Sequence, residues 1–187
     1  MEVGVFSVKI KEDVRSGLLQ MRLKISEERR REARRGVVAR LYSDLCAFPK
    51  ILSFASKEQE IDLWSLNSML AKEGRLLLPR LVDAIHMSAF MVRDLALDLV
   101  MHPKWGFLEP NPDRCPAVTS EHIGCVLVPG VGFDAYHQRL GYGKGFYDRF
   151  LAKLHCPFYG IGFYEQYLSS PIPAQPHDIP LSKIYFF

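Results

Sequence analysis

The sequence predicts an α/β fold, in which a mostly parallel central sheet is covered by helices on both faces. Short apolar runs bounded by glycine or proline alternate along the chain with longer amphipathic stretches. That alternation is typical of parallel strands joined by crossover helices. The chain has 187 residues, of which 48% are hydrophobic, and it contains no segment with the composition of a linker. We therefore expect residues 1–187 to form a single three-layer domain.

The N-terminal part predicts two helices. Within residues 9–24, apolar side chains recur at helical spacing and charged side chains occupy the opposite face. Ser26 can cap a second helix that runs on to Leu45, and the two glutamates that follow Ser26 suit the positive end of the helix dipole.

The remainder of the chain alternates between expected strands and helices. Apolar runs predict strands at residues 51–56, 76–79, 124–130, 158–163 and 184–187. Helical spacing predicts helices at residues 58–72 and 147–154. Residues 88–101 are apolar enough for either a helix or a strand. Residues 102–122 hold four prolines and are expected to form a long connector.

Composition excludes several classes of protein. No apolar run approaches the roughly 18 residues that a membrane span needs, and early charges interrupt any signal-peptide core. The four cysteines lie far apart and form no Cys-x-x-Cys pair, so neither a zinc site nor a disulfide framework is expected. We expect a cytoplasmic protein with reduced thiols and no membrane partner.

Positive charge is concentrated near the N-terminus. Residues 9–40 carry 11 of the 24 lysines and arginines against 5 acids. Such a segment can bind nucleic acid or a polyanionic small molecule, or can be a solvated helix face. RNA binding would require aromatic side chains among the cations. Residues 9–40 contain none, and Tyr42 lies just beyond. We therefore expect no nucleic-acid partner, with RNA binding kept as an alternative.

A glycine-rich block at residues 139–149 is the most informative motif. Three glycines alternate with side chains, which lets the backbone approach a ligand closely and form a concave anion site. Arg139 and Lys144 add charged donors for phosphate, and Asp148 adds a hard oxygen ligand suited to Mg²⁺. The spacing matches neither the P-loop nor the dinucleotide fingerprint. The block predicts a site for a metal-bound nucleoside triphosphate.

The residues around this block make it specific for one family. Val128-Pro129-Gly130-Val131-Gly132-Phe133-Asp134, followed by Arg139-Leu140-Gly141-x-Gly143-x-Gly145-x-Tyr147-Asp148-Arg149, resembles the signature of 5-formyltetrahydrofolate cyclo-ligases, also called methenyltetrahydrofolate synthetases. Further blocks are similar to the family in the same order: Lys11-x-x-x-Arg15, Phe54-Ala55-Ser56 with Glu60-Ile61, Leu78-Pro79, Trp105-Gly106-Phe107-Leu108-Glu109-Pro110, Gly162-Phe163-x-x-Gln166 and His177-Asp178. The chain departs from the family pattern at Leu63, at Phe146 and at its aromatic ending, Tyr185-Phe186-Phe187.

The resemblance implies a reaction and a fold. The family uses ATP and Mg²⁺ to convert 5-formyltetrahydrofolate to 5,10-methenyltetrahydrofolate, ADP and phosphate, on a Rossmann-like scaffold similar to that of sugar-phosphate isomerases and CoA transferases. A formamide oxygen is a poor leaving group, whereas its phosphorylated form can be expelled when the N10 amine attacks. Positioning and charge neutralisation would therefore dominate catalysis.

The resemblance also implies roles for individual residues. Lys11 and Arg15, four apart on one helix face, and Lys144 are the expected catalytic residues. The expected ATP-binding residues are Lys11, Arg15, Arg139, Leu140, Gly141, Tyr142, Gly143, Lys144, Gly145, Phe146 and Tyr147. The expected folate-binding residues are Arg15, Ala55, Glu60, Trp105, Tyr142, Gly143, Lys144, Gly145 and Phe146, with Phe54 as a further apolar wall. The expected Mg²⁺ ligands are Asp148 and Asp178.

Some choices stay open from the sequence. Asp134 is a third acid near the glycine block, although a role in a turn is the stronger expectation. A folate- or nucleotide-binding paralogue without turnover is an alternative to the enzyme. A sugar-phosphate isomerase or CoA transferase on a related scaffold would not explain Lys11, Arg15 and the glycine block together. We expect a monomer.

Overall fold

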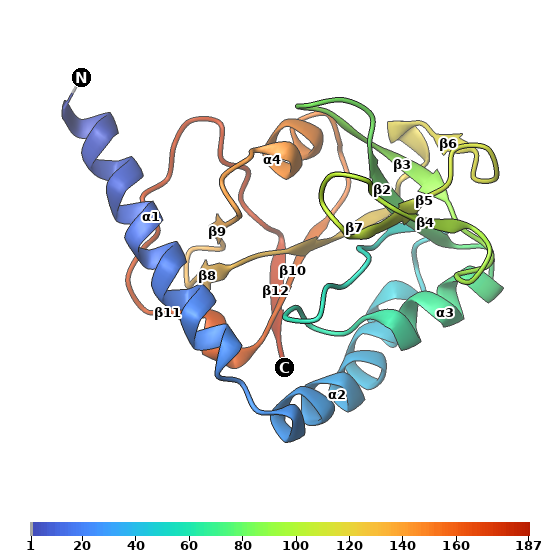
Figure 1. Cartoon of the computed structure of the whole chain (residues 1–187), viewed down its shortest axis with the longest axis horizontal. Helices are drawn as coiled ribbons and strands as arrows, with labels where there is room; N and C mark the ends of the chain where they lie inside the picture. The colour runs from blue at the N-terminus through green and yellow to red at the C-terminus, as the bar shows by residue number, and fades with distance from the viewer. Residues whose placement is uncertain (1) are drawn as a thin grey trace.

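A seven-stranded, mostly parallel sheet forms the centre of the molecule (Figure 1). The computed structural model describes the backbone of residues 2–187 and the side chains of residues 10–187. Met1 and the side chains of residues 2–9, Lys9 among them, lie outside the described part. The strands of the central sheet, in spatial order, are β12 (Lys183–Phe186), β10 (Phe158–Gly162), β7 (Cys125–Pro129), β1 (Ile51–Leu52), β2 (Leu76–Leu81), β3 (Met87–Met91) and β6 (Ala117–Val118). The strands from β12 to β2 run parallel, and β3 is antiparallel to both of its neighbours.

Helices cover both faces of this sheet. The helices are α1 (Glu2–Leu23), α2 (Glu27–Leu45), α3 (Trp64–Lys72) and α4 (Phe146–Leu151). Ile51 packs in the core beneath α2 and α3, whereas the next residue, Leu52, packs with Leu151 of α4 on the other face. Successive strand residues point to opposite faces, so strands this apolar require cover on both sides. The predicted α/β fold with its mostly parallel sheet is confirmed.

Two smaller sheets and two 3-10 turns complete the fold. They are β8 (Gly132–Asp134), β9 (Arg139–Leu140) and β11 (Tyr167–Leu168) in one sheet, β4 (Leu99–Met101) and β5 (Leu108–Pro110) in the other, and the turns η1 (Ser120–His122) and η2 (Tyr164–Gln166). Helix α1 packs through Leu18 against Val131, Leu140 and Ile172. The hairpin β8–β9 therefore places the glycine block beside α1.

The structure corrects several predicted element boundaries. The helix expected at residues 58–72 begins at Trp64, because side chains before it bond locally to the backbone: Glu60 accepts from the N–H of Lys57, and Asp62 accepts from the N–H of Trp64. Such bonds compete with helical ones. The first strand covers only residues 51–52, and α4 ends at Leu151.

The proline-rich segment is more ordered than expected. Residues 102–122, predicted to be a connector, contain β5, β6 and η1. Pro110 ends β5 in a two-stranded sheet, where a missing N–H is tolerated. The ambiguous residues 88–101 contain most of β3, then a turn, then β4. In that turn Asp98 accepts from the N–H groups of Arg93 and Asp94.

The aromatic C-terminus packs inside the domain. Tyr185 and Phe187 are 4% and 5% exposed and belong to the core beneath α2. A Cβ at Gly36 would lie 3.2 Å from the Phe187 ring, so α2 approaches this ring closely. Among the described residues, no helix combines the length and apolar character needed to cross a membrane. All four cysteines are free thiols, as the sequence predicts.

Candidate functional site

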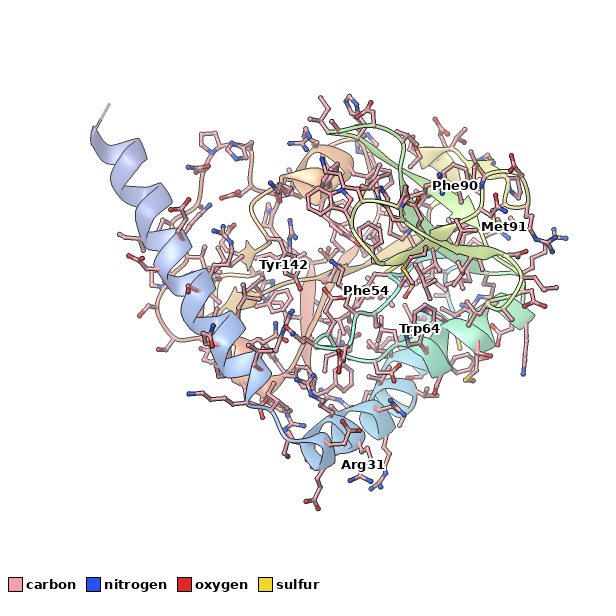
Figure 2. All side chains as sticks on the ribbon, in the orientation of Figure 1. Arg31, Phe54, Trp64, Phe90, Met91 and Tyr142 are labelled. Atoms are coloured by element: carbon pink, nitrogen blue, oxygen red, sulfur yellow. The ribbon has the colours of Figure 1, made fainter. Side chains whose placement is uncertain are left out.

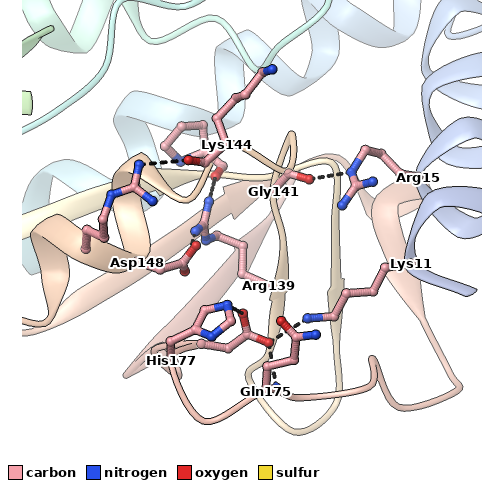
Figure 3. A network of polar contacts seen from close by, with 11 residues as sticks. Lys11, Arg15, Arg139, Gly141, Lys144, Asp148, Gln175 and His177 are labelled. Carbon is pink, nitrogen blue, oxygen red and sulfur yellow. Dashed lines mark hydrogen bonds and ion pairs between the residues drawn. The ribbon is translucent and has the colours of Figure 1, made fainter. Parts of the chain in front are cut away.

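Helix α1 carries two of the predicted site residues to the C-terminal half of the chain. Lys11 Nζ donates to Asp178 Oδ2 at 2.6 Å, and Arg15 Nε donates to the carbonyl oxygen of Gly141 at 2.8 Å (Figure 3). These contacts span 167 and 126 residues of sequence. The fold therefore joins the N-terminal cations to the glycine block and to the His177-Asp178 segment.

Arg139 and Asp148 form a second ion pair within the glycine block. Arg139 Nη2 donates to Asp148 Oδ1 at 2.7 Å, and Nη1 donates to the carbonyl oxygen of Pro129 at 3.3 Å (Figure 3). The Arg139 side chain is only 6% exposed and lies over the ring of Tyr147. Its Nε has no partner within the described residues. A buried guanidinium with a free N–H can donate to another anionic oxygen.

The backbone of the block needs glycine at two positions. Gly143 and Gly145 have φ angles of 85° and 67°, in the left-handed region that other residues rarely adopt. Arg15 also lies close, because a Cβ at Gly143 would be 3.4 Å from its Nη2. The loop is therefore shaped by its glycines and held against α1 by Arg15.

The two predicted metal ligands are both paired with cations. Asp178 accepts from Lys11 and from the N–H of Gln175 (2.8 Å), and Asp148 accepts from Arg139. Nowhere in residues 10–187 do three or more His, Cys, Asp or Glu side chains gather in a way that could hold a metal ion. Mg²⁺ commonly takes only one or two protein carboxylates and completes its shell with water and phosphate. The donor set therefore suits Mg²⁺ when phosphate is also present.

Asp134 has the turn role that the sequence favoured. Its Oδ1 accepts from the N–H groups of Tyr136 and Gln138, both at 2.9 Å, and its Oδ2 accepts from the N–H of Ile172 at 2.7 Å. These three bonds stabilise the β8–β9 hairpin and the segment after β11, and Asp134 is only 1% exposed, so its role is structural.

An open pocket of about 460 Å³ lies beside the glycine block. Four aromatic rings contribute to its walls, so we call it the aromatic pocket. The lining residues come from four parts of the chain: Arg22, Ala55, Ser56, Lys57, Glu58, Gln59, Trp64, Met101, Trp105, Gly106, Phe107, Leu108 and Tyr142. Lys57 Nζ lies 5.0 Å from the centre of the Phe107 ring and 5.1 Å from that of Tyr142. Lys144 Nζ lies 5.9 Å from the Trp105 ring. Flat rings bordered by ammonium groups suit a planar ligand that carries negative charge.

Tyr142 belongs to the glycine block and also lines this pocket. Its ring is exposed, while its hydroxyl accepts from Arg22 Nη2 at 2.6 Å and donates to Glu60 Oε1 at 3.0 Å. In Figure 2, Tyr142 lies between α1 and the segment that carries Phe54. Burial of the hydroxyl, and then the negative charge of Glu60, raise the pKa of Tyr142 to about 12. Tyr142 is therefore a neutral hydroxyl at physiological pH.

Tyr147 is a second neutral tyrosine beside the same carboxylate. Burial raises its pKa, and the charge of Glu60 acts in the same direction, while Arg139 opposes both. The charge of Glu60 therefore raises the pKa of two tyrosines from the glycine block, and it accepts a hydrogen bond from one of them, Tyr142.

The structure brings most predicted folate residues together, with exceptions. Ala55, Trp105 and Tyr142 line the pocket, and Glu60 lies behind Tyr142 and is 8% exposed. Phe54 is 4% exposed and belongs to the main core, so its interpretation as a pocket wall is wrong. Gly143, Lys144, Gly145 and Phe146 do not line this pocket, although Lys144 reaches its rim, away from the Lys11 and Arg139 network (Figure 3).

Sequence reasoning did not assign several of the pocket residues, among them Arg22, Lys57 and Phe107. Lys57 directly follows the Phe54-Ala55-Ser56 block, and Phe107 lies within the Trp105 block. Arg22 lies eleven residues after Lys11, which is about three helical turns, so the two cations share a helix face. That spacing is a signal from which Arg22 could have been found.

Comparisons with known proteins agree with this arrangement. A model of the 5-formyltetrahydrofolate cyclo-ligase family matches residues 7–186. The 5-formyltetrahydrofolate cyclo-ligase of Mycolicibacterium smegmatis is 29% identical over 198 residues, which cover 95% of this chain and 94% of that protein. A probable 5-formyltetrahydrofolate cyclo-ligase of Schizosaccharomyces pombe is 31% identical over 99 residues, which are 51% of this chain and 48% of that protein.

A solved structure supports the same assignment. The NMR structure of Aquifex aeolicus 5,10-methenyltetrahydrofolate synthetase superimposes with a TM-score of 0.81 at 30% identity, covering 94% of this chain and 88% of that one. The resemblance seen in the sequence is thereby confirmed. The chain belongs to the 5-formyltetrahydrofolate cyclo-ligase family.

Proposed function

We propose that this chain catalyses the ATP-dependent cyclisation of 5-formyltetrahydrofolate to 5,10-methenyltetrahydrofolate, with release of ADP and phosphate. The family match over residues 7–186 supports the reaction. One observation supports where the reaction takes place: Tyr142 belongs to the glycine block and also lines the aromatic pocket. A reaction between a nucleotide and a folate needs two such subsites in contact.

ATP binds at the glycine block in this proposal. The backbone of residues 141–145, Arg15, and the Lys11 and Arg139 side chains contact the phosphates. When ATP binds, its phosphate oxygens replace the carboxylates of Asp178 and Asp148 as partners of Lys11 and Arg139. Each cation thus exchanges one anionic partner for another, at little net cost in free energy. Asp148 and Asp178 are then free to hold Mg²⁺, which neutralises phosphate charge when bound.

The folate occupies the aromatic pocket. Trp105 and the exposed ring of Tyr142 offer flat faces to the pterin, and Lys57 and Lys144 offer positive charge at the rim. Glu60 already accepts hydrogen bonds from Tyr142 and from the N–H of Lys57. An ionised carboxylate has about four acceptor sites, so two remain for pterin N–H donors.

The chemistry needs little from the protein beyond positioning. The formyl oxygen attacks the γ-phosphorus of ATP, and ADP leaves with the electron pair of the broken P–O bond. The N10 amine then attacks the formyl carbon, N10 loses its proton, and the phosphorylated oxygen leaves as phosphate. Arg15 and Lys144, on the two sides of the loop, stabilise the negative charge that moves between these groups.

One assay tests the reaction directly. Purified protein is mixed with 5-formyltetrahydrofolate, ATP and Mg²⁺, and the methenyl chromophore is followed by absorbance. We expect its formation to require all three small molecules. If intact, folded protein forms no chromophore at saturating ATP, the cyclo-ligase activity is excluded, and a folate- or nucleotide-binding protein without turnover becomes the better interpretation.

RNA binding has less support from the structure. Arg29 is paired with Glu165, Arg40 donates to the carbonyl oxygen of Phe186, and Arg30 donates to that of Arg22. Arg31 points outward from the end of α2 (Figure 2). Several cations of the basic segment therefore stabilise the fold, and filter binding of RNA at increasing salt should show only weak, salt-sensitive retention.

A further inference from the structure

Arg22 is a buried cation that the proposed chemistry does not use. It lies on α1, is 2% exposed and borders the aromatic pocket. Its Nη2 donates to the Tyr142 hydroxyl at 2.6 Å, and Nη1 makes a long contact of 3.4 Å with the carbonyl oxygen of Gly130. Its Nε has no partner among the described residues. Burying a guanidinium with so few hydrogen-bond partners costs free energy of folding, so we asked which function could require Arg22 at this position.

The bond to Tyr142 fixes the direction of a hydrogen-bond chain. Arginine can only donate, so the Tyr142 hydroxyl must accept from Arg22. The single hydroxyl proton is then directed to the carboxylate of Glu60, 3.0 Å away. In the reverse arrangement, a protonated Glu60 would donate to the Tyr142 hydroxyl. The hydroxyl proton would then point at Arg22, so that two donors would face each other. The geometry therefore makes Glu60 Oε1 the final acceptor of this chain.

Arg22 and Glu60 also compensate each other electrostatically. Both are buried, at 2% and 8% exposure, and one hydroxyl bridges them. Within the part of the chain that the structure describes, neither forms a direct ion pair. A buried charge without a direct partner is stabilised by an opposite charge nearby in a medium of low dielectric.

We propose that Arg22 is a positioning residue for the folate subsite, acting through Tyr142 to hold Glu60 as an acceptor for a flat heterocycle with N–H donors. The same contact holds the exposed Tyr142 ring in the orientation in which it lines the pocket. Arg22 contacts none of the reacting groups. This inference rests on the proposed function, because it assigns the pterin to the pocket that Tyr142 lines.

The test measures folate binding and turnover separately. The variants are Arg22→Met, which keeps the length and loses every donor; Arg22→Lys, which keeps a charge and a donor; Tyr142→Phe; and Arg22→Met combined with Tyr142→Phe. The dissociation constant of 5-formyltetrahydrofolate is obtained from quenching of tryptophan fluorescence, and the KM values for folate and ATP from the methenyl assay. Thermal unfolding of each variant reports its stability. Arg29→Met is the matched control, because Arg29 is a partly buried arginine whose contacts lie outside the pocket.

Loss of a hydrogen bond to a charged group predicts about a tenfold weaker binding of 5-formyltetrahydrofolate for Arg22→Met and for Tyr142→Phe. The double variant should bind folate scarcely more weakly than either single variant, because both substitutions interrupt the same hydrogen-bond chain. Arg22→Lys should recover part of the loss. The KM for ATP should change less than twofold, whereas a general loss of structure would affect both substrates. Arg29→Met should lower the unfolding temperature and leave folate binding unchanged.

Two results would overturn the inference. One is a folded Arg22→Met protein with wild-type folate binding; the other is additive effects of Arg22→Met and Tyr142→Phe. If Arg22→Met does not fold, Tyr142→Phe and Arg22→Lys decide, because Tyr142 is an exposed loop residue. Failure of the proposed function has a different signature, namely a wild-type protein that binds folate and forms no methenyl product.

Discussion

The glycine block separates two regions that are built on different principles. On one side, Asp148 and Asp178 are each paired with a cation at 2.6–2.7 Å, and the four side chains are 6–19% exposed. On the other side, aromatic rings line an open pocket, and Glu60 lies behind one of them, where it accepts a hydrogen bond from the Tyr142 hydroxyl. In the proposed function, the paired residues form the phosphate region and exchange partners when ATP binds, whereas the pocket forms the folate region and keeps its arrangement.

This difference follows from the chemistry of the two ligands. A triphosphate with Mg²⁺ brings charges of both signs, so paired acids and bases can release each other and bind it. A pterin brings a flat ring and a few directional N–H groups, so it gains from fixed acceptors and rigid walls. Changes to the phosphate region should therefore affect ATP use strongly, and changes to the pocket should affect folate binding more mildly.

Removal of Arg139 should have the largest effect. Arg139→Met removes a buried guanidinium from the proposed phosphate site and leaves Asp148 without its partner. By analogy with the loss of one donor to developing charge, kcat should fall by roughly 10²–10³-fold. ADP release in the presence of folate measures it. Arg114→Met, which removes an arginine paired with Asp98 outside the glycine block, is the control and should keep wild-type kcat.

Lys11 and Asp178 should separate phosphate binding from metal binding. Lys11→Met should raise the KM for ATP about 10- to 100-fold through loss of a charged hydrogen bond. Asp178→Asn should instead raise the Mg²⁺ concentration that gives half-maximal rate. Titrations of ATP and of Mg²⁺ in both variants measure this. Identical shifts in both titrations for both variants would contradict distinct roles for the two residues.

Trp105 should affect only the folate. Trp105→Ala removes a half-exposed ring from the pocket wall, and loss of one stacking surface should weaken folate binding by about tenfold. Because Trp105 lies outside the core, the unfolding temperature should stay within about 2 °C of wild type. An equal rise in the KM for ATP would break the division into two regions.

The smallest effect concerns the ionisation of Tyr142. Its pKa is raised to about 12 by burial of the hydroxyl and by Glu60. The folded state thus retains a proton that the unfolded chain loses near pH 10, so this contribution to stability is complete below pH 10 and is lost as the pH rises towards 12. The difference in phenolate absorbance between wild type and Tyr142→Phe should show one tyrosine that titrates near pH 12. A midpoint near 10 would show that its hydroxyl is free.

The sequence predicts the sheet and the glycine block well, because both are local patterns. The continuous apolar runs in Leu76–Leu81 and Cys125–Pro129 indicate buried strands from the local sequence alone. The start of α3 was predicted too early, because side-chain bonds of Glu60 and Asp62 to the backbone decide it. Short strands such as β6 depend on pairing with β3, which no local pattern reveals.

Candidate site residues could be predicted from the sequence where a motif names them. Which side chains face the pocket was harder to predict, because packing of the folded chain determines it. Arg15 does reach the glycine block, where Arg139 and Asp148 pair with each other, whereas Lys11 pairs with Asp178. Phe54 was wrongly assigned to the pocket, because an aromatic residue next to a motif can face either way, and this one faces the core. The chain from Arg22 through Tyr142 to Glu60 joins three segments, so it becomes visible only in the folded protein.

The coupling of ADP release to methenyl formation is the sharpest test of phosphoryl transfer at the glycine block. With folate and Mg²⁺ present, we expect one ADP for every 5,10-methenyltetrahydrofolate formed, and almost no ADP when folate is omitted. Methenyl product without ADP, or rapid ADP release without folate, would contradict the transfer of a phosphoryl group to the formyl oxygen at the glycine block.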